Sequence, residues 1–158
     1  MSGIFQSGSV TPGHVVTWVT DGVVHDGGAL PAAARVIAML GSANFNDTGD
    51  QPLILTPTMT AFMLTGIIVT NATLSLTTAV GGFYPQASKT GTAFVSAGQV
   101  YTSLTDPTKL LSCTLGGAVA TTRYSRANIP DWVLYLSLTT PQGSPVTADC
   151  YAIGIDLS

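Results

Sequence analysis

The sequence predicts an all-β fold: an antiparallel β-sandwich of jelly-roll type, preceded by an extended N-terminal arm with a hairpin. Charged residues make up only 8% of the 158-residue chain. Glutamate is absent and lysine occurs twice, so two residues that favour helices are scarce, whereas threonine and valine, which favour pleated surfaces, are abundant. From residue 52 onward, short apolar runs alternate with turn signals roughly every 8–15 residues, near the spacing typical of sandwiches.

The first 30 residues predict a small hairpin. A turn at Thr11-Pro12-Gly13 precedes an extended run over 14–19, and Asp21-Gly22 has the composition of a hairpin turn before the chain returns over 23–25. Two strands this short are marginal alone, so we expect this segment to pack against something else.

The segment 31–50 is expected to connect this hairpin to the main domain. Residues 31–40 begin with a proline that a first helical turn tolerates and stop at Gly41, so a helix and an extended linker are both compatible with them. The polar, turn-rich stretch 42–50 reads as a loop. We therefore expect an anchoring arm over 1–50 and a sandwich over 51–158.

The segment 51–158 predicts about eight strands. No helix fits convincingly between them, which favours antiparallel over parallel βαβ topology. In the last run, Tyr151, Ile153 and Ile155 fall on one face, and the residues between them fall on the other. The expected strands cover residues 53–55, 61–70, 82–84, 92–95, 100–104, 110–115, 132–139 and 148–157.

The scarcity of charge bears on partners. A formal net charge of −3 offers no basic footprint for nucleic acid. A chain that hides much of its surface in subunit contacts needs less surface charge than a free monomer, which favours a homodimer, a homotrimer or a lattice component. Residues 1–9 lack the features of a secretory signal, and no run approaches the roughly 18 apolar residues of a membrane span. We expect synthesis in the cytoplasm and no membrane partner.

Catalytic and metal sites have little support. His14, Asp21, His25 and Asp26 are close in sequence and could face one another across the hairpin, but turn geometry explains the aspartates equally, and zinc would require more ligands at tighter spacing. The loop 44–50 resembles a calcium loop but lacks the later acidic ligand. We expect no catalytic residue, metal or cofactor.

Aromatic residues suggest a different kind of site. Tyr84, Tyr124 and Trp132 could stack on a sugar, or they could anchor the core or an interface. Arg123 and Arg126, on either side of Tyr124, make only a weak basic patch for nucleic acid.

Two cysteines, Cys113 and Cys150, lie in apolar runs. In a cytoplasmic product they are expected to be buried free thiols, with a disulfide as the alternative.

Three segments carry a resemblance to a known group of proteins. Residues 8–23 (GSVTPGHVVTWVTDGV), 66–72 (GIIVTNA) and 134–140 (LYLSLTT) resemble small virion structural proteins of tailed bacteriophages, and with their surroundings they cover about half the chain. The resemblance implies a jelly-roll sandwich that cements the capsid exterior or forms head or tail fibres. It also implies an N-terminal module that anchors the protein to the particle, shaped by these residues: Pro12, Gly13, His14, Trp18, Asp21 and Gly22.

The expected function is therefore that of a capsid decoration, or cement, protein on the virion surface. Its partners would be the major capsid protein or other virion proteins, together with further copies of itself. The alternatives are a head- or tail-fibre component that binds a host surface glycan, and a small particle-borne hydrolase that uses His14 and Asp21.

Overall fold

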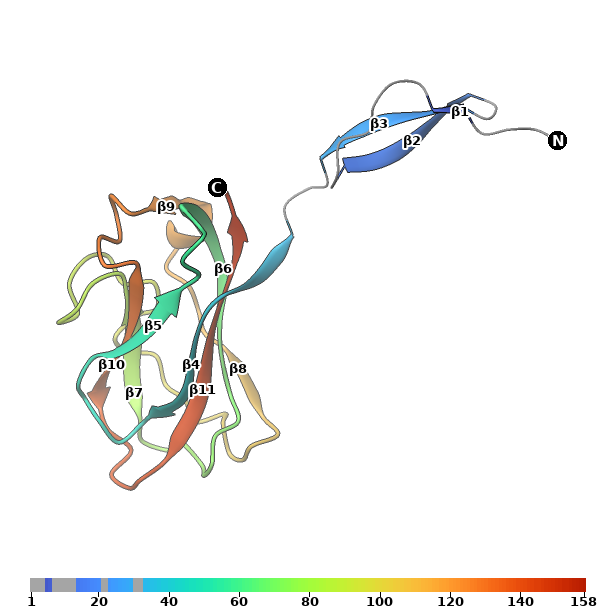
Figure 1. The fold of residues 1–158 in the computed structure, drawn as a ribbon. Helices are drawn as coiled ribbons and strands as arrows, with labels where there is room; N and C mark the ends of the chain where they lie inside the picture. The colour runs from blue at the N-terminus through green and yellow to red at the C-terminus, as the bar shows by residue number, and fades with distance from the viewer. Residues whose placement is uncertain (1–4, 7–13, 21–22, 30–32) are drawn as a thin grey trace. The chain divides into compact units, whose positions relative to one another are not determined.

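The computed structural model describes residues 5–6, 14–20, 23–29 and 33–158 (Figure 1). The chain divides into two compact units, Met1–Ala32 and Ala33–Ser158. The all-β prediction is confirmed, since among the described residues the only helical segment is a 3-10 turn, η1 (Val119–Thr121). Within the same residues, no helix has the length and apolar character needed to span a membrane. The second unit includes 33–50, which the sequence had suggested as part of the arm.

The N-terminal unit is a three-stranded sheet of β1 (Phe5–Gln6), β2 (His14–Thr20) and β3 (Val23–Ala29). The predicted hairpin strands form: β2 and β3 pair antiparallel, while β1 pairs parallel with β3. The register sets His14 opposite Ala29 and His25 opposite Thr17, so the two histidines are not cross-strand partners. Asp21 and Gly22, expected at the turn, lie outside the described residues.

The second unit is one curled antiparallel sheet, a half-barrel. The strand order is β7-β10-β5-β4-β11-β6-β8, and β9 also pairs with β6. The bounds are β4 Ala34–Asn44, β5 Gln51–Leu55, β6 Ala61–Thr70, β7 Val80–Tyr84, β8 Leu110–Ser112, β9 Arg123–Ser125, β10 Val133–Thr140 and β11 Thr147–Asp156.

A hairpin of β4 and β5 occupies the middle of this sheet. The two last strands, β10 and β11, flank it on opposite sides, so the connection 141–146 crosses over the β4–β5 turn. Backbone hydrogen bonds hold this crossing: Phe45 N donates to Val146 O at 3.0 Å, and Gln142 N donates to Phe45 O at 2.8 Å. The side chain of Asn46 accepts a further bond from Gly143 N at 2.8 Å.

The helix considered over 31–40 does not form, because Ala34–Asn44 is strand β4. β11 pairs along this strand from Ala34 to Asn44, and this tertiary pairing overrides the weak helix preference of alanine, methionine and leucine. Ile37 is an extra residue between the pairs Ala38–Ala152 and Val36–Ile153, which makes a β-bulge.

The two edges of the curled sheet approach each other through the segment around Val95. Val95 makes antiparallel bridges to Phe83 of β7 and to Leu115, which follows β8. Gly82 permits this close approach, because a Cβ atom there would overlap the carbonyl oxygen of Val95. The strands expected over 92–95 and 100–104 are reduced to single bridges at Val95 and Val100, since the long loop packs by side chains rather than by a continuous ladder.

The core fills the inside of the curl. Alternation places one set of side chains inward on each strand, as in β11, where Ala148, Cys150, Ala152 and Gly154 are buried. Ser137 is the buried polar residue of the core, and its hydroxyl donates a hydrogen bond to the carboxylate of Asp50. The largest side chains that are almost fully enclosed are Phe45, Phe62, Phe83, Phe94 and Tyr101.

Candidate interaction surface

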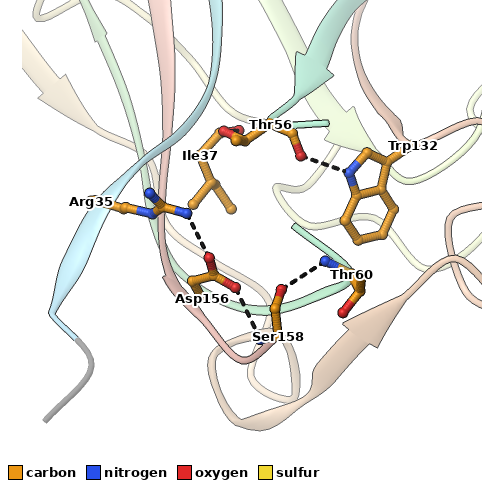
Figure 2. A network of polar contacts seen from close by, with 7 residues as sticks. All are labelled: Arg35, Ile37, Thr56, Thr60, Trp132, Asp156 and Ser158. Atoms are coloured by element: carbon orange, nitrogen blue, oxygen red, sulfur yellow. Dashed lines mark hydrogen bonds and ion pairs between the residues drawn. The ribbon is translucent and has the colours of Figure 1, made fainter. Parts of the chain in front are cut away.

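Trp132, one of the aromatic residues expected at a sugar or interface site, lies in the core and is only 4% exposed. Its ring meets the edge of Phe62 at 5.7 Å between centroids, and the guanidinium of Arg126 lies 4.8 Å from its centroid. Its indole Nε1 donates to the carbonyl oxygen of Thr56 at 3.1 Å (Figure 2). A ring enclosed in this way offers no free face for a sugar. Of the two roles expected for Trp132, the structure therefore shows that of a core anchor.

Tyr84 is buried too, whereas Tyr124 is partly exposed. The ring of Tyr124 stacks on Phe62 at 5.6 Å and meets Phe94 edge-to-face at 4.9 Å, so most of its contacts are with the core. Burial raises the pKa of the Tyr124 phenol.

An open cavity of about 290 Å³ adjoins Tyr124. Its other walls include the amide side chains of Gln86 and Asn128. Asn128 uses its Oδ1 within its own turn, where it accepts from the backbone nitrogen of Ser125 at 3.2 Å. Tyr124 is the predicted sugar-stacking aromatic that borders this cavity.

The residues expected to shape the anchor lie in the first unit. His14 and Trp18 belong to β2, for which the structure gives backbone pairing. Pro12, Gly13, Asp21 and Gly22 lie outside the described residues. Their role in anchoring therefore stays a prediction.

The main surface feature is an apolar row on the outer face of the sheet, which the sequence did not predict. Val133, Ile54, Met39, Tyr151 and Ile68 are successive cross-strand partners across β10, β5, β4, β11 and β6. Ile54 is 67% exposed and Met39 56% exposed. We call these five residues the outer row.

A shorter apolar pair lies beside the outer row. Val36, which is 50% exposed, is the cross-strand partner of Ile153, two residues along β11 from Tyr151. The bulge at Ile37 explains this position, because the extra residue lets both Val36 and Met39 face outward while Ile37 and Ala38 are buried. A shallow groove between β4 and β5 lies against the same residues.

The five strands of the outer row carry three charged residues, all placed toward strand ends: Arg35, Asp149 and Asp156. Arg35 and Asp156 form an ion pair at 2.6 Å (Figure 2). Asp149 accepts from Ser42 N at 2.8 Å and from Asn71 Nδ2 at 2.9 Å. Each charged side chain thus has a hydrogen-bond partner within the subunit, and the apolar area between them is uncharged.

Ser158 organises the charged end of this face. Its backbone nitrogen donates to Asp156 at 3.0 Å, and its hydroxyl oxygen accepts from Thr60 N at 2.8 Å (Figure 2). Hydrogen bonds from Ser158, followed by the nearby Arg35 guanidinium, lower the pKa of the Asp156 carboxyl. The arrangement keeps Asp156 ionised and paired at the margin of the apolar face.

The two cysteines are buried free thiols, so the expected disulfide alternative does not describe them. Burial raises the pKa of the Cys113 thiol to about 12 and raises that of Cys150 as well. Both are therefore protonated near neutral pH and are poor nucleophiles. In the described part of the chain, His, Cys, Asp and Glu side chains form no group of three that could hold a metal ion.

Comparisons of this chain with protein-family models, with curated protein sequences and with solved structures give no match.

Proposed function

We propose that this protein is a structural subunit of a tailed-phage virion that decorates the capsid surface and stabilises it through subunit contacts. The observation that carries the proposal is the outer row, an uncharged apolar strip across five strands in which Met39 and Ile54 are exposed and the other three residues are half-buried. The largest contiguous apolar patch on the surface of a soluble protein is often a functional site. The resemblance of residues 8–23 and 134–140 to phage virion proteins supplies the biological context.

The composition supports the same proposal. Only 8% of the residues are charged, so few charged groups lose their hydration when neighbouring subunits cover the surface, and the desolvation penalty is small. Each contact contributes little alone, but many copies on one particle add up to a large effect. In this proposal the N-terminal unit anchors the protein to the particle, and the second unit contacts neighbouring subunits.

The expected two-layer sandwich belongs to this proposal. The second unit has one curled sheet whose outer face is apolar, and a sandwich arises when another sheet covers that face about 10 Å away. The jelly-roll strand order stays a prediction.

Addition of the full chain to capsids prepared without it tests the function. We expect saturable binding in many copies and a higher melting temperature of the capsid. The full chain with His14→Ala and Trp18→Ala should bind capsids less while the melting temperature of its second unit is unchanged. Capsids that melt at the same temperature with and without bound protein would contradict the cement role.

A further inference from the structure

We propose that the outer row packs against the outer row of a second copy, related by a two-fold axis that passes beside Met39. This inference rests on the proposed function and names the neighbour that covers the apolar face. It concerns a contact between copies of this chain, separate from the contact with the capsid.

The charged residues of this face indicate which kind of partner can pack against it. Arg35 and Asp156 pair with each other, and two neutral donors hold the carboxylate of Asp149, so the face presents no cation for a nucleic acid phosphate and no charge at its apolar centre. A charged partner placed here would lose water without gaining a counter-charge. An uncharged, apolar, twisted sheet avoids this penalty, and a second copy provides one.

The order of residues in the row is compatible with self-association. Met39 is the middle residue, with Ile54 and Val133 on one side and Tyr151 and Ile68 on the other. A two-fold axis between two facing sheets brings Met39 against its own copy, whichever in-plane direction the axis takes. When the axis runs along the strands or perpendicular to them, the two rows overlie each other and every other residue of the row also meets an apolar residue. The flexible thioether of Met39 can fill the gaps left at the axis.

The size of the face is adequate for the centre of a dimer interface. Five strands about 4.8 Å apart span roughly 19 Å, and Val36 and Ile153 extend the apolar area by about 7 Å along the strands. With the side-chain margins this gives on the order of 400 Å², about half of the ~800 Å² per partner in a standard interface. Polar residues around the row would form the rim.

The first test is the assembly state of the full chain by sedimentation over about 1–100 μM. We expect a dimer, and a trimer or a monomer throughout this range would overturn the proposal.

The variant Met39→Glu/Ile54→Lys places opposite charges on cross-strand partners. The two charges compensate each other within one subunit but become buried in the dimer. We expect it to dimerise at least about 100-fold more weakly.

A matched control carries the same charges elsewhere. Leu74 and Leu110 are each 59% exposed and lie outside the outer row. The variant Leu74→Glu/Leu110→Lys should dimerise like the unchanged chain. Equal dimerisation of both double variants would overturn the proposed interface.

A cross-linking test locates the axis. Met39→Cys should give a covalent dimer with a short bismaleimide, whereas Leu74→Cys and the unchanged chain, whose own cysteines are buried, should not. Capsid binding separates the two proposals. If the chain stabilises capsids but Met39→Cys does not cross-link to its copy, the proposed function is supported and the proposed dimer contact is contradicted.

Discussion

The indole nitrogen of Trp132 donates a hydrogen bond to the carbonyl oxygen of Thr56, at 3.1 Å. The bond joins the residue that precedes β10 to the residue that follows β5. Leu55 N also donates to Trp132 O at 3.2 Å, so the two segments are linked by both backbone and side chain. Trp132 thus links the end of β5 to the start of β10 and does not offer an exposed aromatic surface.

Replacement of this indole should weaken the fold. Trp132→Phe removes the donor and part of the buried ring, and we expect the free energy of unfolding to fall by about 1–3 kcal/mol. Urea unfolding measures the change. A variant as stable as the unchanged chain would show that the bond and the packing of the ring contribute nothing.

The bulge in β4 predicts a coupled pair of substitutions. A Cβ atom at Gly154 would lie 2.6 Å from Cδ1 of Ile37 and 2.8 Å from the carbonyl oxygen of Met63. Gly154→Ala should therefore destabilise the protein by about 1–3 kcal/mol, by overpacking. Ile37→Val removes Cδ1, so the double variant should be less destabilised than the sum of the single variants.

Gly117 provides the control for this experiment. A Cβ atom there has nothing within 4 Å. Gly117→Ala should leave the free energy of unfolding within about 0.5 kcal/mol of its original value. Additive single changes at Gly154 and Ile37 would contradict the contact between them.

Substitution of Tyr124 distinguishes a structural role of this residue from a role in glycan binding. Its ring contacts Phe62 and Phe94, so Tyr124→Leu should lower the free energy of unfolding by about 1–3 kcal/mol. On a glycan array we expect the unchanged chain to give no signal. A signal that Tyr124→Leu abolishes, with the variant still folded, would instead support a fibre component whose sugar site is the cavity beside Tyr124.

The buried thiol of Cys113 predicts loss of stability at alkaline pH. Its pKa is about 12 in the folded protein, against 9.0 for an unshifted cysteine thiol. The folded state therefore holds the proton more tightly, and the stabilisation from the protonated thiol is fully present below about pH 9 and is lost as pH rises toward 12. At pH 10 this loss amounts to about 1–2 kcal/mol.

Urea unfolding of the unchanged chain and of Cys113→Ala at pH 7 and pH 10 measures this effect. Burial raises the pKa values of Cys150 and Tyr101 too, so both proteins should lose stability on going to pH 10. The loss should be smaller in Cys113→Ala. Equal losses would contradict the raised pKa of the Cys113 thiol.

Strands with a long apolar run or with clear alternation were predicted best from the sequence. The strand expected over 61–70 has those bounds in the structure, and the face assigned to Tyr151, Ile153 and Ile155 is distinct from the buried face of β11. The 31–40 segment was harder, because its alanines and leucine fit a helix and its bulge breaks the period of two.

The sequence did not predict the outer row, because it does not show which residues of an apolar run face the core. Ile54 and Leu55 are both aliphatic and adjacent, and the sequence alone does not tell which of them faces the core. In the structure Leu55 is fully buried and Ile54 is 67% exposed. Only the pairing with neighbouring strands shows that Ile54, Met39 and Tyr151 lie side by side.

The position of β11 beside β4 affects how the chain reaches its native state. The ion pair between Arg35 and Asp156 joins residues 121 positions apart, and the β4–β11 ladder closes most of the second unit into one loop. Pairing so distant in sequence slows folding, typically to milliseconds or seconds. Until the last strand arrives, one edge of β4 has no ladder to join. Newly made chains therefore pass through a period in which this edge can capture another chain, and slow synthesis or high temperature would lead to aggregation rather than assembly.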